Sequence, residues 1–204
     1  MSHPAFFDQA PVITVYDALA EFLGASDDGL LTYRYIDAVR LAGHSCPTVA
    51  GAYLMARRAL QLLYPGDTPE RGGLQVRFTA SIEDGVAGVI GSVIGLVTGV
   101  AGPGGFKGIG HHFRRQNLMV FGHPAEGEVR FDRLDNDTSV QLSLHANRVA
   151  ADPRTNVLLR KILSGEAAKP EAAEFAQLWQ DRVRRILLEH ADDPELISTV
   201  AARL

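Results

Sequence analysis

The sequence predicts an α+β fold, in which a mostly antiparallel or mixed sheet is packed by helices and a helical appendage follows at the C-terminus. Three observations support this prediction. An apolar stripe with helical spacing follows Pro47, short segments of alternating polarity begin at Leu74, and the pattern is helical from about Asp152 onward. Since the chain has 204 residues, of which 46% are hydrophobic, we expect one main α+β domain over residues 1–150 and a helical extension over residues 151–204 packed on it.

The N-terminal part of the chain predicts a helix followed by a strand. In residues 12–24, Val15, Leu19 and Phe22 recur at helical spacing, which favours a helix over this range. Residues 30–41 are rich in β-branched and aromatic side chains, and they predict a strand that leads directly into the next motif.

Residues 47–63 predict an amphipathic helix. Val49 and Tyr53 belong to an apolar stripe that continues through this range, and Pro47 suits the first helical position because its missing N–H would have no partner there. This assignment places Cys46, the only cysteine of the chain, at the N-cap position.

The middle of the chain predicts strands around a glycine-rich segment. Residues 74–80 alternate in polarity like a half-buried strand. In residues 85–106, glycines recur at steps of three and four, so on a helix they would share one face and let another backbone or a ligand approach closely. A strand and loop with bulges is the alternative. Three further strands are expected at residues 117–121, 128–134 and 139–145, and three C-terminal helices at residues 153–163, 170–190 and 194–204.

Charge and composition argue against several classes of partner. A net charge of −4 gives no broad attraction for phosphate backbones, so we expect no nucleic-acid partner. Residues 85–106 carry no charge and are long enough to cross a bilayer, but many of them are glycine, so we expect no membrane span. One cysteine forms no internal disulfide, and the N-terminus lacks the basic start and apolar run of a signal peptide, so we expect a cytoplasmic protein.

His44 and Cys46 are the first candidates for chemistry. At a helix N-terminus the free N–H groups and the helix dipole favour an anion, so a thiol there is shifted toward the thiolate, which attacks electrophiles and binds soft metals. His44, at the expected end of a strand, would face the same point. The alternative is a small buried thiol beside a histidine whose hydrogen bonds are satisfied.

The stretch AGHSCPTVAGAYLMARRAL resembles the Gly-His-x-Cys-Pro signature, with its following helix, of the FmdE family, which is named after formylmethanofuran dehydrogenase. Gly43, His44, Cys46 and Pro47 match at the level of the motif, and the resemblance extends more loosely over residues 28–122. It implies an α+β domain in which the signature cysteine and histidine lie at a cleft associated with metal binding.

The sequence also departs from that family. Thr48 stands where members commonly have glycine, and Gly91 and Ser92 lie in a region where members often have a second cysteine. The cysteine-paired zinc ribbon that many members carry at the C-terminus is absent. An intrachain dithiol cycle and a closed four-cysteine zinc site therefore do not carry over to this chain.

Histidines from a glycine-rich loop are the best candidates to complete a metal site. Thiolate and neutral imidazole are both good ligands for zinc and other late transition metals, so His44 and Cys46 could be joined by His111 or His112. Adjacent residues of an extended segment point to opposite faces, so only one of these two would ligate. The alternative is that both are exposed loop residues. His123 and His145 are further candidates for the third ligand.

Arg114 and Arg115 follow these histidines. Arginine suits bidentate recognition, so the pair could clamp a carboxylate or phosphate of a small-molecule ligand. A solvated basic edge is the alternative.

Three functions are compatible with these residues. The first is a zinc or late-transition-metal protein of the FmdE type with a Cys/His site in a small-molecule cleft, where the ion would activate water or a carbonyl as a Lewis acid. The second is a metal-free thiol enzyme or ligand-binding protein, with Cys46 as nucleophile and His44 or His112 as base. The third is an interaction protein that docks a partner through the apolar stripe of residues 175–186. The glycine stripe also suggests a homo-oligomer, most simply a homodimer.

Overall fold

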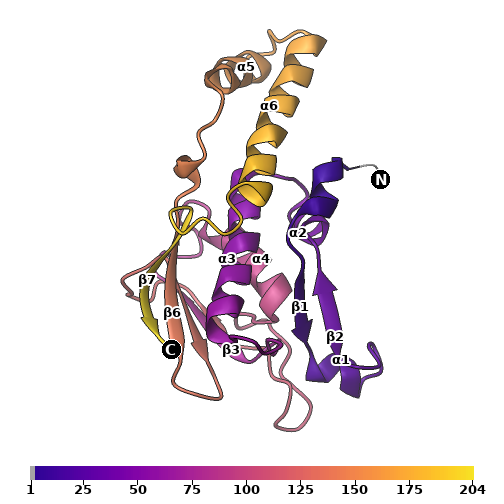
Figure 1. Cartoon of the computed structure of the whole chain (residues 1–204), viewed down its shortest axis with the longest axis vertical. Coiled ribbons are helices and arrows are strands. Elements are labelled where there is room, and N and C mark those ends of the chain that lie inside the picture. Colours follow the sequence, from indigo (N-terminus) through magenta and orange to yellow (C-terminus); the bar gives the residue numbers. More distant parts are fainter. Residues whose placement is uncertain (1–2) are drawn as a thin grey trace.

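The computed structural model describes residues 3–204 and shows an α+β fold with two sheets (Figure 1). The larger sheet has five strands in the order β4-β3-β5-β6-β7. All neighbouring strands run antiparallel except β3 and β4, which are parallel, so the predicted mixed sheet is confirmed. Its strands are β3 (Leu74–Phe78), β4 (Met119–Val120), β5 (Val129–Arg133), β6 (Ser139–Leu144) and β7 (Ile197–Arg203).

Helices lie between this sheet and a small N-terminal sheet. In Figure 1, α3 and α4 lie between the five-stranded sheet and the antiparallel pair β1 and β2, while α5 and α6 extend beyond the sheet. These elements are β1 (Ile13–Tyr16), α1 (Ala18–Phe22), β2 (Leu30–Tyr33), α2 (Tyr35–Ala42), α3 (Pro47–Leu63), α4 (Ala87–Thr98), α5 (Pro153–Leu163) and α6 (Lys169–Leu188), with 3-10 turns η1 (Ala5–Gln9) and η2 (Ala146–Arg148). Within residues 3–204, every helix is too short or too polar to cross a membrane.

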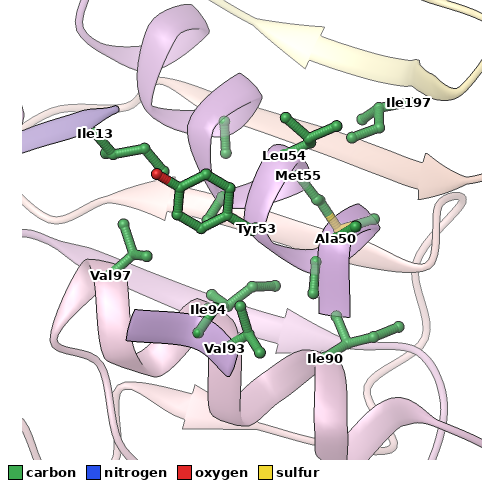
Figure 2. Packing of buried hydrophobic residues seen from close by; sticks show 14 of the residues in the cluster. Ile13, Ala50, Tyr53, Leu54, Met55, Ile90, Val93, Ile94, Val97 and Ile197 are labelled. Atoms are coloured by element: carbon green, nitrogen blue, oxygen red, sulfur yellow. The ribbon is translucent and has the colours of Figure 1, made fainter. Parts of the chain in front are cut away.

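The hydrophobic core is built around α3. Tyr53 and Met55 of this helix are fully buried, and they pack in one cluster with Val93 and Ile94 of α4 (Figure 2). The same helix also contacts β6 and α6. Each fully buried aliphatic or aromatic side chain contributes about 1.5–3 kcal/mol, so α3 makes a large contribution to the stability of this core.

The predicted helix over residues 47–63 is confirmed, with Cys46 as its N-cap. Pro47 occupies the first turn, and the Cys46 sulfur accepts a hydrogen bond from the Val49 N–H at 3.4 Å. Gly51 lets the helix approach the sheet closely, since a Cβ there would lie 2.5 Å from the Leu144 side chain.

The helical interpretation of the glycine-rich segment is confirmed for α4. Gly91 and Gly95 share a face of this helix, and a Cβ on Gly91 would lie 2.8 Å from the Phe121 ring. On Gly95 it would lie 2.9 Å from the Val100 carbonyl oxygen. Gly91 therefore allows the segment around β4 to pack directly against α4, and Gly95 allows the chain that leaves α4 to pack against the same helix.

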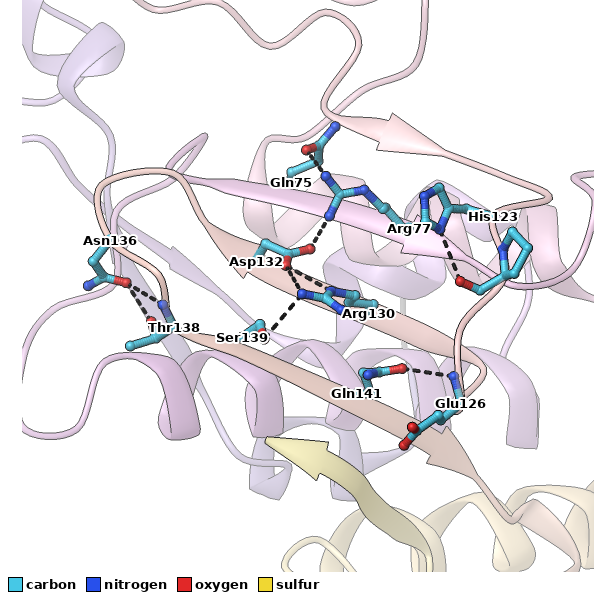
Figure 3. Close-up of polar contacts among 11 residues, drawn as sticks. Gln75, Arg77, His123, Glu126, Arg130, Asp132, Asn136, Thr138, Ser139 and Gln141 are labelled. Atoms are coloured by element: carbon cyan, nitrogen blue, oxygen red, sulfur yellow. Dashed lines mark hydrogen bonds and ion pairs between the residues drawn. The ribbon is translucent and has the colours of Figure 1, made fainter. Parts of the chain in front are cut away.

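Polar side chains cover part of the sheet (Figure 3). Arg77 of β3 and Arg130 of β5 lie directly opposite each other in the strand register, which would be unfavourable for two like charges. Asp132 offsets this repulsion because it bonds both guanidinium groups, at 2.8 Å from the Arg130 Nε. Carboxylate and guanidinium groups thus stabilise this part of the sheet.

The predicted helix over residues 12–24 is correct only for residues 18–22. Residues 13–16 form β1, which pairs with β2 in the register Ile13↔Tyr33 to Tyr16↔Leu30. Asp17 then caps the short helix α1 by accepting hydrogen bonds from the N–H groups of Leu19 and Ala20. The non-local pairing with β2 overrides the helical spacing of the apolar residues.

The predicted strand over residues 30–41 is correct only as far as Tyr33. The Arg34 N–H donates to the Asp37 carboxylate at 2.9 Å, a capping interaction that starts α2 at Tyr35. Asp37, which precedes the His44 and Cys46 motif, therefore serves to begin a helix.

At the C-terminus, the helices predicted over residues 153–163 and 170–190 are confirmed as α5 and α6, within two residues at each end. The helix predicted over residues 194–204 is wrong, because this segment forms β7 and pairs with β6. Without β7, strand β6 would present an unpaired edge. Because β6 lies more than 50 residues before β7 in the sequence, the local pattern of residues 194–204 does not reveal this pairing.

Candidate functional site

The His44–Cys46 segment lies in the turn between two helices, not at the end of a strand as predicted. Gly43 adopts φ 75°, and its N–H donates to the Val39 carbonyl at 2.9 Å, which ends α2. Shortly afterwards α3 begins at Pro47. This left-handed glycine turns the chain sharply, so His44 and Cys46 are held between the end of one helix and the start of the next.

Cys46 is 9% exposed and contributes its sulfur to the N-cap of α3. The Val49 N–H of the first turn donates to this sulfur. The predicted N-cap position of Cys46 is therefore confirmed.

His44 is exposed, and its ring orientation is set by the backbone. Its Nδ1 lies 2.9 Å from the Ala42 carbonyl oxygen, which only accepts hydrogen bonds. With Nδ1 as the donor, the neutral ring carries its lone pair on Nε2. No hydrogen bond within residues 3–204 engages that Nε2. His44 thus presents a nitrogen that can bind a proton or a metal ion.

His44 lines a small pocket between the end of α2 and the helix α4. This histidine pocket has a volume of about 150 Å³ and is lined by Leu41, Ala42 and His44 on one side and Val89, Ser92 and Val93 of α4 on the other. Next to it runs a groove of about 420 Å³ that shares Leu41 and Ser92 with the pocket and follows Gly88, Gly91 and Gly95. We call this the glycine groove. His44 is therefore a polar group at one end of a mainly apolar cleft.

Ser45, between the two motif residues, is bound by α6. Its carbonyl oxygen accepts hydrogen bonds from Trp179 Nε1 at 3.1 Å and Gln180 Nε2 at 3.2 Å. Its hydroxyl donates to Gln180 Oε1 at 3.0 Å and lies 2.9 Å from the Tyr35 hydroxyl. Since the Ser45 hydroxyl gives its one proton to Gln180, the Tyr35 hydroxyl, whose pKa is raised by burial, donates to Ser45.

These three partners of Ser45 were not among the predicted site residues. Tyr35 lies shortly before the motif, but Trp179 and Gln180 are more than a hundred residues away in the sequence. Trp179 is the only tryptophan of the chain, and its isolated polar N–H in an apolar stripe was the one available signal.

The structure does not assemble the predicted metal ligand set. Within residues 3–204, no group of three or more His, Cys, Asp or Glu side chains could hold a metal ion. His111 and His112 are exposed in the glycine-rich loop, and His112 lines a different pocket. His145 contacts the Ser198 hydroxyl, and His123, whose Nδ1 contacts the Pro124 carbonyl as that of His44 contacts Ala42, lies in the loop after β4. Of the predicted ligands, only His44 and Cys46 belong to one segment of the chain.

The predicted arginine pair is split between two roles. Arg115 is 8% exposed, and its guanidinium donates to Asp17 at 2.7 Å and to the Arg71 carbonyl. Arg71 donates to the other oxygen of the same carboxylate, also at 2.7 Å. Arg114 is instead exposed at the rim of a pocket.

Asp17 and Arg71 are functional candidates that the sequence reasoning missed. Burial alone would raise the pKa of Asp17, which is 3% exposed, but the hydrogen bonds and charges of Arg71 and Arg115 outweigh this and lower it. An aspartate directly before a short helix is a recognisable capping signal. Its two arginine partners follow only from the fold.

A larger pocket of about 490 Å³ contains none of the predicted residues. It lies between the ends of β3 and β5 and the start of α4, where Phe78 and Ile90 provide apolar surface. Its carboxylates are Asp84, Glu126 and Glu128, and Glu128 accepts a hydrogen bond from the Leu144 N–H. The volume of a pocket therefore does not show where the candidate site residues lie.

Comparison with known proteins identifies one family. The family model described as "FmdE, Molybdenum formylmethanofuran dehydrogenase operon" matches residues 41–194. No curated protein matches the chain. The matched range includes His44 and Cys46, the glycine groove, and the α6 residues that bind Ser45.

Proposed function

This chain belongs to the FmdE family, and from that premise we propose that it binds zinc or another late transition metal ion through His44 and Cys46, beside a small-molecule cleft formed by the glycine groove. The family description associates such proteins with formylmethanofuran dehydrogenase. The metal, the ligand and any reaction belong to the proposal.

The observation that carries this proposal is the orientation of His44. Histidines that ligate metals almost always donate their other ring N–H to a carbonyl or carboxylate, which fixes the ring and its tautomer. The Nδ1 contact with the Ala42 carbonyl is of this kind, and it leaves Nε2 available.

Cys46 supports the same assignment. Its sulfur lies at the N-cap of α3, and cysteine sulfur is a soft donor for such metals. Imidazole nitrogen and thiolate sulfur together are a common zinc donor pair.

The donor chemistry fits such an ion, but the described residues supply two donors and not three. The remaining positions would take water, a ligand in the groove, or a donor from a second chain. When bound, an ion of this kind provides a Lewis acid. The Ala42 carbonyl and the Val49 N–H orient the two donors, and the apolar residues of the glycine groove would contact a ligand.

Elemental analysis of protein purified without an affinity tag or added metal tests the proposal. We expect close to one metal ion per chain in the wild type and loss of that metal in Cys46→Ala and His44→Ala. His123→Ala is the matched control, since His123 is exposed and lies in another loop. A wild type without metal, or equal metal in all four proteins, contradicts the proposal.

A metal-free thiol protein is the second candidate. The two-donor set favours it, because a thiolate nucleophile needs one activating environment and no third ligand. In that case the wild type contains no metal, Cys46 reacts with iodoacetamide faster than a free cysteine at pH 7, and His44→Ala slows the reaction.

A further inference from the structure

We propose that a pocket next to the Asp17, Arg71 and Arg115 cluster binds the phosphate or carboxylate group of a small molecule. This arginine pocket has a volume of about 200 Å³ and is lined by Glu70, Arg71, His112, Phe113, Arg114 and Arg115, among others. The inference does not depend on a metal at His44 and Cys46.

The charge of the cluster is the first argument. One carboxylate, Asp17, is bonded by two guanidinium groups, Arg71 and Arg115, so the three side chains carry one positive charge in excess. At the pocket wall Arg114 adds a positive charge and Glu70 a negative one, which leaves the balance at one positive charge. Two guanidinium groups share one carboxylate here, so the excess positive charge would attract an anion that enters this pocket.

The loop that closes the pocket offers free hydrogen-bond donors. Arg114 makes no ion pair and no side-chain hydrogen bond within the described part of the chain. The N–H groups of Phe113 and Arg114 likewise donate to no group of residues 3–204. Phe113 adopts φ 62°, a left-handed conformation that is rare for an aromatic residue. Successive N–H groups around such a residue can form a concave anion site.

Buried contacts hold the wall of the pocket in place. The second Nη of Arg71 donates to the Leu96 carbonyl at 3.1 Å, and the Gly72 N–H donates to the Thr98 carbonyl at 2.7 Å. Gly72 adopts φ 86°, which favours glycine, and a Cβ there would displace the Arg115 guanidinium. Arg71 and Arg115 are thus fixed before any ligand arrives, which reduces the entropy lost on binding.

The arginine pocket is separate from the histidine pocket along α4. His44 faces Val89, Ser92 and Val93, whereas Arg71 and Gly72 contact residues 96 and 98. With a rise of 1.5 Å per residue, Ser92 and Thr98 lie about 9 Å apart along the helix axis. The two sites are therefore distinct.

Size and donor geometry limit the ligand class. A volume of about 200 Å³ accommodates one tetrahedral or planar oxyanion with a short attached chain. The planar guanidinium of Arg114 would bind two oxygens of such a group at once.

Calorimetric titration with inorganic phosphate, and separately with acetate, tests the proposal at constant ionic strength with chloride as the reference anion. We expect phosphate, acetate or both to bind the wild type, and Arg114→Ala to weaken that binding at least about tenfold. Arg114→Lys keeps the charge but loses the bidentate geometry, so its affinity should be intermediate. Arg160→Ala removes an exposed arginine of α5 and should leave binding unchanged.

Two results would overturn the proposal. One is an absence of binding by both anions to the wild type. The other is equal affinity in Arg114→Ala and the wild type, with circular dichroism showing both folded. Titration of Cys46→Ala after removal of metal separates this proposal from the previous one, because the anion should bind there with wild-type affinity whether or not the metal assignment holds.

Discussion

Gln180 of α6 binds Ser45 twice, donating from Nε2 to the Ser45 carbonyl at 3.2 Å and accepting at Oε1 from the Ser45 hydroxyl at 3.0 Å. Ser45 stands between His44 and Cys46, so the relative position of these two side chains depends on a helix 135 residues further along the chain. The C-terminal helices therefore support the site as well as the core.

Gln180→Ala should loosen the motif without removing either candidate donor. Loss of two hydrogen bonds at a part-buried position should lower the free energy of unfolding by about 1–3 kcal/mol. Cys46 should react faster with Ellman's reagent under native conditions, because the segment that buries it opens more often. Gln177→Ala, at an exposed position of the same helix, is the matched control. Equal labelling rates in the two variants would show that Gln180 does not hold the motif.

Asp17→Asn should destabilise the fold strongly. The variant leaves the buried Arg115 and the half-buried Arg71 without their shared carboxylate, and breaking a buried ion pair in this way typically lowers the free energy of unfolding by about 3–5 kcal/mol. Chemical denaturation at pH 7 measures the loss. Asp27→Asn removes a carboxylate from an exposed turn and should change the stability by less than about 0.5 kcal/mol.

The contribution of Asp17 should also depend on pH. Its pKa is lower in the folded protein than in the unfolded chain, where an aspartate has a pKa of about 3.9. Its stabilising contribution is therefore fully present above about pH 4 and is lost as the pH falls through the folded pKa. The difference in unfolding free energy between the wild type and Asp17→Asn should shrink as the pH is lowered from about 6 to about 3. A constant difference over this range would mean that the carboxylate does not act through its charge.

The local sequence was sufficient to predict the helices that begin with a proline in the first turn. Pro47 and the apolar stripe behind it predicted α3 at its observed bounds, and Pro153 did the same for α5. Cys46 was placed at the N-cap for the same reason. Where the structure depends on pairing between distant segments, the local pattern failed, as it did for β1 and β7.

The site was predictable in part. His44 and Cys46 are close in the sequence, so their proximity follows from the motif alone. The binding of Ser45 by Trp179 and Gln180, and the sharing of Asp17 by Arg71 and Arg115, join segments that only the fold brings together. For the same reason the sequence could not show that His112 and Arg115 line a pocket separate from His44.

Gly95→Ala should be unfavourable although alanine is the better helix former. A Cβ at this position would lie 2.9 Å from the backbone oxygen of Val100, which has little freedom to move. Overpacking of about 1–3 kcal/mol should exceed the gain of about 1 kcal/mol in helix propensity. Gly104→Ala is the control, since a Cβ there meets no atom within 4 Å. Thermal denaturation should show a lower Tm for Gly95→Ala alone.

Residues 1–150 should not fold cooperatively without residues 151–204. The C-terminal segment supplies Val183, Ile186 and Leu187, which are fully buried in the core cluster that contains α3, and it supplies β7, which pairs with β6. Without this segment, a face of α3 and the edge of β6 would both meet water, and Ser45 would lose its partners on α6. We expect the fragment of residues 1–150 to show no cooperative unfolding transition by circular dichroism, and to regain one when residues 151–204 are added as a separate peptide. If the fragment alone unfolds cooperatively with nearly the stability of the whole chain, residues 151–204 are an appendage to a domain that is complete without them.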